Sequence, residues 1–454
     1  MTNSAVKEAS SHYQLSTVNS QLNEVPVGYK QTEVGVIPYD WEAACLGEIA
    51  AVRMCKRILA GQTQKVGAIP FFKIGTFGSE PDAYIPYSLY EEFKAKYSFP
   101  AEGDILISAA GTLGKSVVYD GKPAYFQDSN IVWLEINKRK LLNEYLYHYY
   151  KVIKWASSEG STIARLYNGI IRASMIALPP IEEQTAIANA LSDVDALISV
   201  LEKLIAKKQA IKTATMQQLL TGRTRLPQFA LREDGTPKGT KPSELGEIPE
   251  DWEVMTLGDI GQTIIGLTYS PNDVAEFGTL VLRSSNVQNG KLAYVDNVFV
   301  NMDLPERVIV RQGDILICVR NGSRQLIGKC ALIDKNAEGS AFGAFMSIFR
   351  TKHSVFVFYQ FQSDLIQNQI NEIMGATINQ ITNKDMSGFK ITLPSDEKEQ
   401  TAIATILFDM DAEIQALEQR LSKTRQIKQG MMQELLTGKT RLVKPAAAGG
   451  SYAH

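Results

Sequence analysis

The sequence predicts a mixed α/β (α+β) fold that is organised as a tandem repeat. Two strand-rich globular segments alternate with two long helices, and we expect the helices to pair as an antiparallel coiled coil about a pseudo-twofold axis. Three observations in the 454 residues predict this arrangement: a head segment that occurs twice, a strand motif that occurs twice, and a helical block that closes each half.

The repeat can be aligned without gaps in three places. The head EVGVIPYDWEAACLGEIA at 33–50 matches ELGEIPEDWEVMTLGDIG at 244–261 in ten of eighteen positions. The strand motif GDILI begins at Gly103 and again at Gly313. The helical blocks, 183–226 and 399–442, share 25 of 44 residues. Because a solenoid needs three or more stacked units, two copies indicate a duplicated module of one domain and one helix.

The segments between these matches differ. Residues 51–102 and 262–312 show almost no similarity, although their surroundings are retained. We interpret these two variable segments as parts that perform the same kind of function on different targets. Ordinary drift of loops stays open as an alternative. Around them, β-forming residues predict strands at 103–108 and 315–319, and helices are expected at 145–155 and 354–373.

The helical blocks carry an apolar seam with a 4-3-4-3-4 spacing, which is typical of a coiled coil. Proline before each block and glycine near each end, at 222 and 438, mark the limits of the helices. The seam residues are Ile187, Leu191, Val194, Ile198, Leu201 and Ile205 in the first block, and Ile403, Leu407, Met410, Ile414, Leu417 and Leu421 in the second.

Composition narrows the classes of function. The formal net charge is −2 at pH 7, so charge alone does not indicate nucleic-acid binding. Residues 27–180 hold 17 Lys and Arg against 15 Asp and Glu, and residues 243–395 hold 12 against 17. The four cysteines form no C-x-x-C pair and lie near none of the four histidines, which predicts reduced thiols and argues against a zinc site. Because no apolar stretch is long enough for a leader or a membrane span, we expect a cytoplasmic protein without membrane contact.

One motif suggests an enzyme. Residues 109–116, AAGTLGKS, resemble a relaxed P-loop that follows a strand. A P-loop lysine and serine must open a helix, whereas the Val-Val-Tyr-Asp-Gly that follows Ser116 predicts a strand and a turn. The tetrapeptides Asn-Pro-Pro-aromatic and Asp-Pro-Pro-aromatic of amino-methyltransferases are absent from the sequence. We therefore predict neither a catalytic residue nor a metal ligand in this chain.

Together these motifs resemble those of a known family. The repeated head, GDILI, GSTIARLYNGIIRASMIALPPIEEQTAIA, its counterpart GATINQITNKDMSGFKITLPSDEKEQTAIA and the blocks ending LLTGRTRL and LLTGKTRL are similar to type I restriction–modification specificity subunits over about residues 27–442. The resemblance implies that each globular segment is a target recognition domain, which reads half of a split site in double-stranded DNA. It implies that the coiled coil sets the gap and docks two modification (methyltransferase) subunits, which work with restriction subunits. It also implies that S-adenosylmethionine, ATP and Mg²⁺ are bound by those partners, and no cofactor by this chain.

Two alternatives stay open beside this interpretation. A nucleotide-binding enzyme would bind ATP through the loop at 109–116. A coiled-coil scaffold without a DNA role would bind no duplex, even with methyltransferase subunits present. The domain limits that we predict are a polar N-terminal segment at 1–26, a first recognition domain at 27–180, a central helix at 181–222, a linker at 223–243, a second recognition domain at 244–394, a C-terminal helix at 395–438 and a disordered tail at 439–454.

Candidate DNA contacts are polar residues in turns beside the predicted strands, because such side chains read base edges or hold phosphates. An ordinary solvated turn is the alternative for each of them. The first domain has Ala109–Ala110 where the second has Arg320–Asn321, so an arginine contact at that loop is not expected in the first. The candidates are Lys73, Thr112, Lys115, Gln127, Ser129, Asn130, Arg165, Tyr167 and Asn168 in the first domain, and Thr268, Tyr269, Ser270, Arg283, Ser285, Asn286, Arg320, Asn321, Ser323, Arg324, Asn379 and Gln380 in the second.

Overall fold

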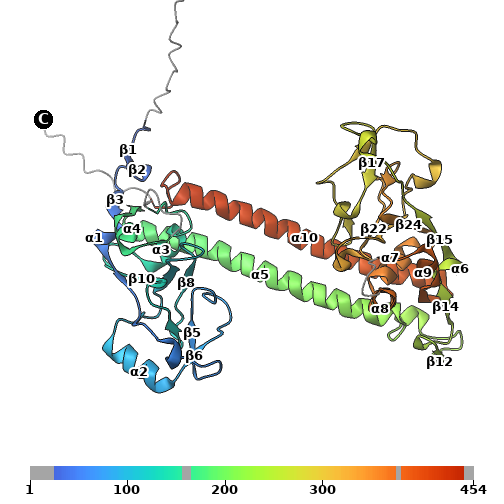
Figure 1. Cartoon of the computed structure of the whole chain (residues 1–454), viewed down its shortest axis with the longest axis horizontal. Helices are drawn as coiled ribbons and strands as arrows, with labels where there is room; N and C mark the ends of the chain where they lie inside the picture. Colours follow the sequence, from blue (N-terminus) through green and yellow to red (C-terminus); the bar gives the residue numbers. More distant parts are fainter. Residues whose placement is uncertain (1–24, 156–164, 375–379, 444–454) are drawn as a thin grey trace, which may run out of the picture. The chain divides into compact units, whose positions relative to one another are not determined.

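The computed structural model describes residues 25–155, 165–374 and 380–443. The chain forms two compact units, which we treat separately: the first unit combines residues 1–199 with 422–454, and the second unit is 200–421. Each unit holds one strand-rich domain together with part of both long helices (Figure 1). Most of the predicted N-terminal segment and tail lies outside the described residues.

An antiparallel sheet in the order β4-β10-β7-β8 lies at the centre of the first domain. Its strands are β4 (Ala50–Arg53), β7 (Ile105–Ser108), β8 (Ser116–Val118) and β10 (Ile131–Ile136). Side chains of a strand alternate between the two faces of a sheet. Ile105 and Ile107 therefore enter one core and Leu106 enters another, which explains why the strand residues of the GDILI motif are all apolar.

Smaller elements cover both faces of this sheet. A second layer in the order β6-β5-β9 packs on one face, where Leu106 and Trp133 meet the aromatic side chains of that layer. Its strands are β5 (Ile69–Phe72), β6 (Tyr84–Ile85) and β9 (Tyr125–Phe126). The other strands are β1 (Tyr29–Thr32), β2 (Gly35–Pro38), β3 (Glu42–Cys45) and β11 (Met175–Leu178), and the helices are α1 (Leu46–Ile49), α2 (Tyr87–Lys96), α3 (Asn143–Tyr149) and α4 (Asn168–Ala173).

The second unit repeats the central sheet in the order β15-β24-β21-β22. Ile315 and Ile317 enter one core and Leu316 the other, as in the first domain. The strands of this sheet are β15 (Gly261–Ile265), β21 (Ile315–Cys318), β22 (Cys330–Leu332) and β24 (Met346–Thr351). The covering layer has four strands, β16 (Val274–Ala275), β17 (Thr279–Leu282), β20 (Phe299–Val300) and β23 (Ala341–Phe342).

The remaining elements of the second unit complete the repeat. The pair β14–β25 corresponds to β3–β11, and the hairpin β12–β13 corresponds to β1–β2. The elements are β12 (Thr240–Ser243), β13 (Gly246–Pro249), β14 (Trp252–Thr256), β18 (Val287–Gln288), β19 (Lys291–Leu292), β25 (Lys390–Pro394), α6 (Leu257–Ile260), α7 (Ser354–Gln362), α8 (Asp364–Ile373) and α9 (Asn383–Gly388).

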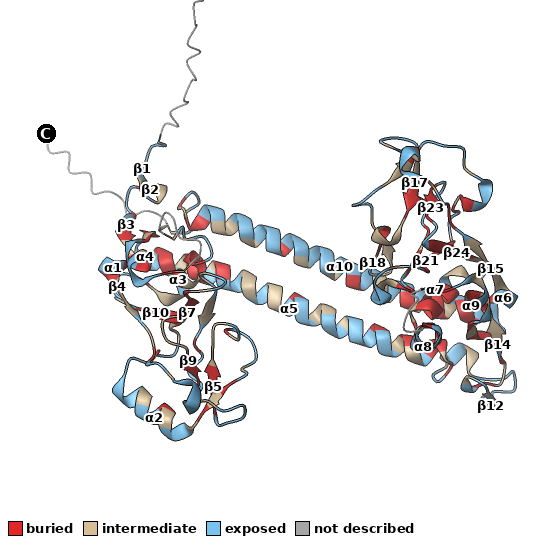
Figure 2. Cartoon of the chain, in the orientation of Figure 1, coloured by how far each residue is buried: buried red, intermediate tan, exposed pale blue. Residues whose placement is uncertain are grey.

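The long helices are α5 (Ile181–Leu220) and α10 (Glu397–Leu435), and they are antiparallel in each unit. In the second unit, Lys208 pairs with Glu413 and Lys212 with Asp411, so residue numbers rise along one helix and fall along the other. Every predicted seam residue is buried or half-buried, and exposed residues cover the outer sides (Figure 2). The predicted fold class is confirmed.

The seam also contains two ion pairs, which occupy equivalent positions in the repeat. Lys212 is 2.6 Å from Asp411 in the second unit, and Lys428 pairs with Asp195 in the first. The Lys212 and Lys428 side chains are only 8% and 15% exposed. A buried charge is stable only when it is paired, so these residues fix the register of the helices more than apolar side chains would.

A buried cluster joins the end of each long helix to a domain, and we call it the arginine clasp. In the first unit, Arg441 lies 2.6 Å from Glu183 and 2.8 Å from Asp40, and Trp41 Nε1 donates to Glu183 at 2.9 Å. The hydrogen bond from Arg441 lowers the pKa of Asp40. The second unit repeats the clasp with Arg225, Glu399, Asp251 and Trp252. Each arginine comes from the helical block of the other repeat, so the two copies are interlocked.

Two expectations about helices need correction, and the expectation of a strand after the loop 109–115 is confirmed. The helix expected at 145–155 is shorter, because α3 ends at Tyr149 and the chain turns there. The helix expected at 354–373 is two helices, α7 and α8, which are separated at Ser363. The loop 109–115 leads into strand β8 and not into a helix, so it lacks the helix N-terminus that a P-loop needs.

Candidate nucleic-acid interface

Each domain has a polar hollow at the same place in its fold. In the first domain, β5 pairs in parallel with β9, and the hollow opens where both strands end. In the second domain, β17 pairs in parallel with β23 and bounds a hollow in the same way. Parallel strands end at one edge of a sheet, so the residues that follow them are brought together. Lys73 follows β5 and Arg283 follows β17, at equivalent positions.

The hollow of the first domain has a volume of about 380 Å³. The loop between β9 and β10 forms one wall and is held by Gln127, whose Oε1 accepts a hydrogen bond from Ile74 N at 2.9 Å. Ser129 in the same loop has a left-handed backbone, with φ of 53°. Four of the predicted contacts line this hollow: Lys73, Gln127, Ser129 and Asn130.

The hollow of the second domain has a volume of about 510 Å³ and a different lining. One wall is formed by residues 343–345, between β23 and β24, and it includes Phe345, which is 56% exposed. Four predicted contacts line it: Thr268, Tyr269, Arg283 and Ser285. The two hollows therefore share a position but differ in size and chemistry.

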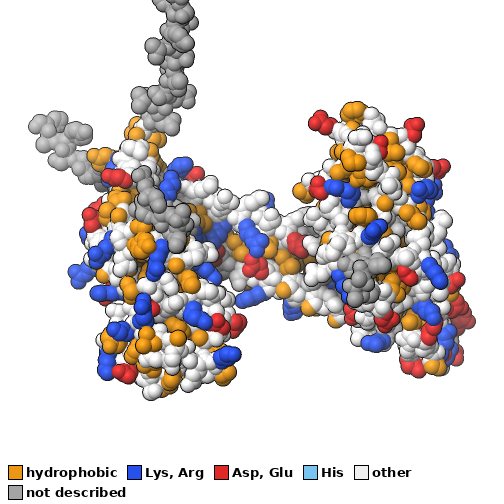
Figure 3. All heavy atoms as spheres, in the orientation of Figure 1, with side chains coloured by type: hydrophobic (Ala, Val, Ile, Leu, Met, Phe, Trp, Pro, Cys, Tyr) orange, Lys and Arg blue, Asp and Glu red, His pale blue; other side chains and the backbone are white. Residues whose placement is uncertain are grey.

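Most cations at the hollows are neutralised by carboxylates. Arg57 is 2.8 Å from Asp128, Lys73 is 2.9 Å from Asp82, and Arg283 is 2.7 Å from Asp296. On the face shown in Figure 3, basic and acidic side chains are interspersed over each domain and form no continuous basic surface. Such sites suit base-edge recognition better than tight binding to bare phosphates.

Two predicted arginines lie beside the hollows without a carboxylate partner among the described residues. Arg165 Nη2 donates to Ser129 Oγ at 3.1 Å and to Asn130 Oδ1 at 3.2 Å, and its guanidinium lies 5.7 Å from the ring centre of Tyr167. The guanidinium of Arg320 lies 5.3 Å from the ring centre of Phe345.

Three other predicted residues of the first domain lie nearby in the chain, Thr112 and Lys115 in the loop before β8 and Asn168 on α4. Thr112 is exposed, and its carbonyl accepts a hydrogen bond from Ser108 Oγ. Lys115 Nζ donates to Phe77 O, which holds the ammonium group within the domain. Asn168 is exposed at the first residue of α4. None of these three lines the hollow.

In the second domain, five predicted residues do not line the hollow. Ser270 Oγ accepts from Asn272 N, which makes it a cap of a short 3-10 helix. Asn321 Nδ2 donates to Ser284 Oγ at 3.2 Å, and its Oδ1 accepts from Ser323 N at 2.9 Å. Arg324 Nη2 donates to Asn371 O at 3.2 Å. Gln380 forms an isolated β-bridge with Arg320.

One predicted contact of the second domain is buried, and another lies outside the described residues. Asn286 is fully buried. Its Oδ1 accepts a hydrogen bond from Arg283 N at 2.9 Å, and its Nδ2 donates to Ala293 O at 2.9 Å. This corrects its prediction as a base contact, because its polar atoms already hold the loop after β17. Asn379 lies outside the described residues.

The lining residues that sequence reasoning missed include four with charged or aromatic side chains: Arg57 and Asp128 in the first domain, and Asp296 and Phe345 in the second. Three of them form the ion pairs described above. Arg57 could have been suspected from the basic run Arg53–Arg57 in the variable segment. Nothing in the sequence indicates that Phe345 is exposed.

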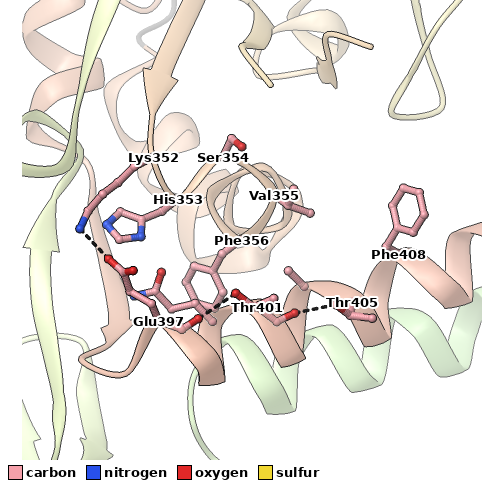
Figure 4. Close-up of a pocket in the computed structure, with 11 residues that line it drawn as sticks. Lys352, His353, Ser354, Val355, Phe356, Glu397, Thr401, Thr405 and Phe408 are labelled. Carbon is pink, nitrogen blue, oxygen red and sulfur yellow. Dashed lines mark hydrogen bonds and ion pairs between the residues drawn. The ribbon is translucent and has the colours of Figure 1, made fainter. Parts of the chain in front are cut away.

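A separate hollow of about 370 Å³ lies between α7 and the first half of α10 (Figure 4). Lys352 and Glu397 form an ion pair of 2.6 Å on one side, and Phe408 stands 58% exposed on the other. The equivalent position on α5 is Ser192, so this exposed aromatic side chain is a feature of one repeat. None of the predicted DNA contacts lines this hollow.

The described residues include no group of three or more His, Cys, Asp or Glu side chains that could hold a metal ion. The buried thiols of Cys55, Cys318 and Cys330 have a raised pKa because burial disfavours the thiolate. Within the described part of the chain, no helix has the length and apolar character that crossing a bilayer requires.

Comparison with known proteins gives matches over most of the chain. The family model for the type I restriction modification DNA specificity domain matches twice, at 38–212 and 249–427. A putative type I restriction enzyme specificity subunit of Haemophilus influenzae, S.HindORF215P, is 54% identical over 152 residues, which are 34% of this chain and only 40% of that protein. The putative type I restriction enzyme MjaX specificity subunit of Methanocaldococcus jannaschii is 29% identical over 91% of this chain and 97% of that protein. The crystal structure of a type I restriction–modification S subunit from M. genitalium shares the fold, with a TM-score of 0.55 and 16% identity over 87% of this chain and 96% of that one.

Proposed function

This chain belongs to the type I restriction–modification DNA specificity family, and from that premise we propose that each of its two recognition domains reads one half of a bipartite DNA site. The pair of hollows carries this proposal. They lie at one place in a repeated fold, and their linings differ. Two copies of one scaffold with different polar linings are suited to two different half-sites.

We further propose that the chain acts in the cytoplasm and supplies no catalytic group. Methyl transfer and cleavage belong to modification and restriction subunits, which bind S-adenosylmethionine, ATP and Mg²⁺. The sequence supports this division of work because it lacks the amino-methyltransferase tetrapeptides. The near-neutral charge supports it too, since partner subunits can supply the phosphate contacts that this chain lacks.

The long helices are proposed to set the gap between half-sites and to dock two modification subunits. The continuity of α5 over 40 residues supports the first role. Phe408 supports the second, because an exposed aromatic ring on a largely polar helix suits a protein interface. Phe408→Glu should weaken co-purification with the modification subunit at least tenfold, whereas Gln419→Glu at another exposed position of α10 should not. Equal retention of both variants would contradict this docking site.

The central experiment is mapping of methylated sites in DNA from cells that express the chain with its modification subunit. We expect one bipartite motif. Replacing residues 262–392 with the matching segment of a relative should change one half of the motif and leave the other half intact. A change in both halves would show that the domains do not read independently. Absence of methylation with a soluble, assembled complex would contradict the proposed function itself.

A further inference from the structure

Three segments meet beside the hollow of the first domain. They are the loop after β7, the loop before β10 and the segment before α4. Ala109 N donates to Asn130 O at 2.8 Å, and Leu166 N donates to Ala109 O at 2.8 Å. Arg165 and Ala110 are therefore neighbours on adjacent segments at one edge of the hollow.

The second domain has the same hydrogen-bond pattern. Val319 N donates to Phe345 O at 3.0 Å, and Ile381 N donates to Val319 O at 2.8 Å. By this pattern Arg320 is the counterpart of Ala110, and Gln380 is the counterpart of Arg165. The arginine therefore lies on a different segment in each domain: on the segment before α4 in the first domain, and on the loop after β21 in the second.

The two guanidinium groups reach equivalent loops in their domains. Arg165 contacts Asn130, the residue before β10, and Arg320 lies on Phe345, the residue before β24. An aromatic ring lies near each, Tyr167 at 5.7 Å and Phe345 at 5.3 Å. The hydrogen bonds that Arg165 makes to described residues use only Nη2, and Arg320 has no side-chain hydrogen bond to any described residue. Donor groups of both arginines are therefore available to a ligand.

We infer that Arg165 and Arg320 are matched specificity-determining residues, each of which reads one guanine in its half-site; this inference rests on the proposed function. Guanine presents two acceptors, N7 and O6, to the major groove, and a guanidinium can donate to both at once. The aromatic ring restricts the guanidinium before DNA binds, which reduces the cost of ordering the side chain. Arg57, Lys73 and Arg283 are less suited to this role, because each is held by a carboxylate.

The test uses the full chain expressed with its modification subunits, and the readout is the methylated motif. In R165Q, one position of one half-site should lose its preference for guanine by on the order of 10-fold to 100-fold, while the other half-site stays intact. R320Q should do the reciprocal. The matched controls are R139Q and R311Q, which alter exposed arginines outside the hollows and should leave both half-sites unchanged.

A double variant tests whether recognition of guanine depends on the position of the guanidinium or on the segment that carries it. A110R/R165Q gives the first domain the layout of the second and should restore the guanine preference at the same base pair. The inference is overturned if R165Q keeps the wild-type motif, if it alters both half-sites, or if A110R/R165Q leaves that position degenerate. If the single variant methylates nothing, the double variant decides: recovery of the motif supports the inference, and continued silence overturns it. The wild-type chain tests the proposed function separately, because it must yield a bipartite motif in the same cells.

Discussion

In the first domain, the layer beside the hollow has three strands, β6-β5-β9, and the chain between β6 and β7 forms helix α2. In the second domain this layer has four strands, β16-β20-β17-β23, and a short hairpin, β18–β19, follows β17. The central sheets, in contrast, have the same strand order, and the arginine clasps have the same four residue types. Divergence is therefore concentrated in the layer that bounds the hollow.

This contrast indicates which parts of the module are constrained. A residue in the clasp must satisfy partners from the other repeat, so a change there is costly in both the domain and the helix. The buried residues of each covering layer pack within the core of their own domain. The same scaffold can therefore hold a new recognition surface without altering the junction with the helices.

The largest effect should follow from breaking a clasp. Arg225→Ala leaves Glu399, whose side chain is 2% exposed, without its cationic partner. Removing one member of a buried ion pair costs about 3–5 kcal/mol, so the second unit should lose most of its protection against hydrogen exchange. Arg441→Ala should do the same to the first unit, because Glu183 is equally buried. Hydrogen-exchange mass spectrometry reports each unit separately.

A surface ion pair serves as the control for this prediction. Arg232→Ala breaks a 2.7 Å pair with Glu250, but both side chains are more than 30% exposed. Exposed pairs contribute about 0–1 kcal/mol, so this variant should unfold like the wild type. If Arg225→Ala is as mild as Arg232→Ala, the clasp is not what joins helix and domain.

Sequence reasoning succeeded where the signal was local. The seam spacing predicted α5 and α10, and the GDILI motif predicted β7 and β21, because periodicity is visible in a short window. The clasp was not predicted, since Arg441 and Glu183 are 258 residues apart in the chain. The buried Lys212 was not predicted as part of the seam, because a lysine normally indicates a solvated face.

The candidate site was predicted only in part, because only some of its features leave a local signal in the sequence. Residues that follow strands, such as Lys73 and Arg283, line the hollows, and strand ends can be located from sequence. Asn286 follows the same rule but is buried, and polarity alone cannot separate a buried amide that holds a loop from an exposed one. Phe345 was missed because an aromatic residue beside a strand normally indicates core.

An intermediate effect is expected at the glycine that ends each helical block. Gly222 has φ of +70°, and a Cβ there would lie 2.5 Å from the ring of Pro249. Gly438 also has φ of +70°, and the ring of Pro38 occupies the same place beside it. Gly222→Ala and Gly438→Ala should each lower the free energy of unfolding by about 1–3 kcal/mol, from left-handed strain and overlap with the ring.

Chemical denaturation of the two variants measures whether the helix ends of the two repeats contribute equally to stability. Gly430→Ala is the control, because Gly430 lies within α10 with no atom within 4 Å of an added Cβ. Alanine is the better helix former, so this variant should be more stable by about 0.5–1 kcal/mol. A destabilised Gly430→Ala, or neutral variants at both 222 and 438, would show that the helix ends are not packed as described.

The smallest effect concerns a position where the two seams differ. In the first unit, His148 Nε2 lies 3.1 Å from Ser192 Oγ, and its Nδ1 is 3.9 Å from Asp195. In the second unit, Tyr359 takes this place and donates to Asp411 at 2.9 Å. Burial, aided by the positive charges of Lys151 and Lys428, lowers the pKa of His148 to about 4. The second unit has a tyrosine here and no group that titrates between pH 4 and 6.5 at this position.

The sign of the pH effect follows from that shift. The pKa of His148 is lower in the folded protein than its usual value of 6.5, so the unfolded chain takes up the proton first. The stability that neutral His148 contributes is complete above pH 6.5 and is lost as the pH falls from 6.5 towards 4. At pH 5.5 the first unit should have lost about 1 kcal/mol relative to pH 7.5, while the second unit loses less. His148→Tyr installs the residue of the second unit and should remove the difference. Hydrogen exchange in each unit at both pH values, corrected for the intrinsic exchange rate, measures this, and an equal loss in wild type and variant would assign the pH dependence to other groups.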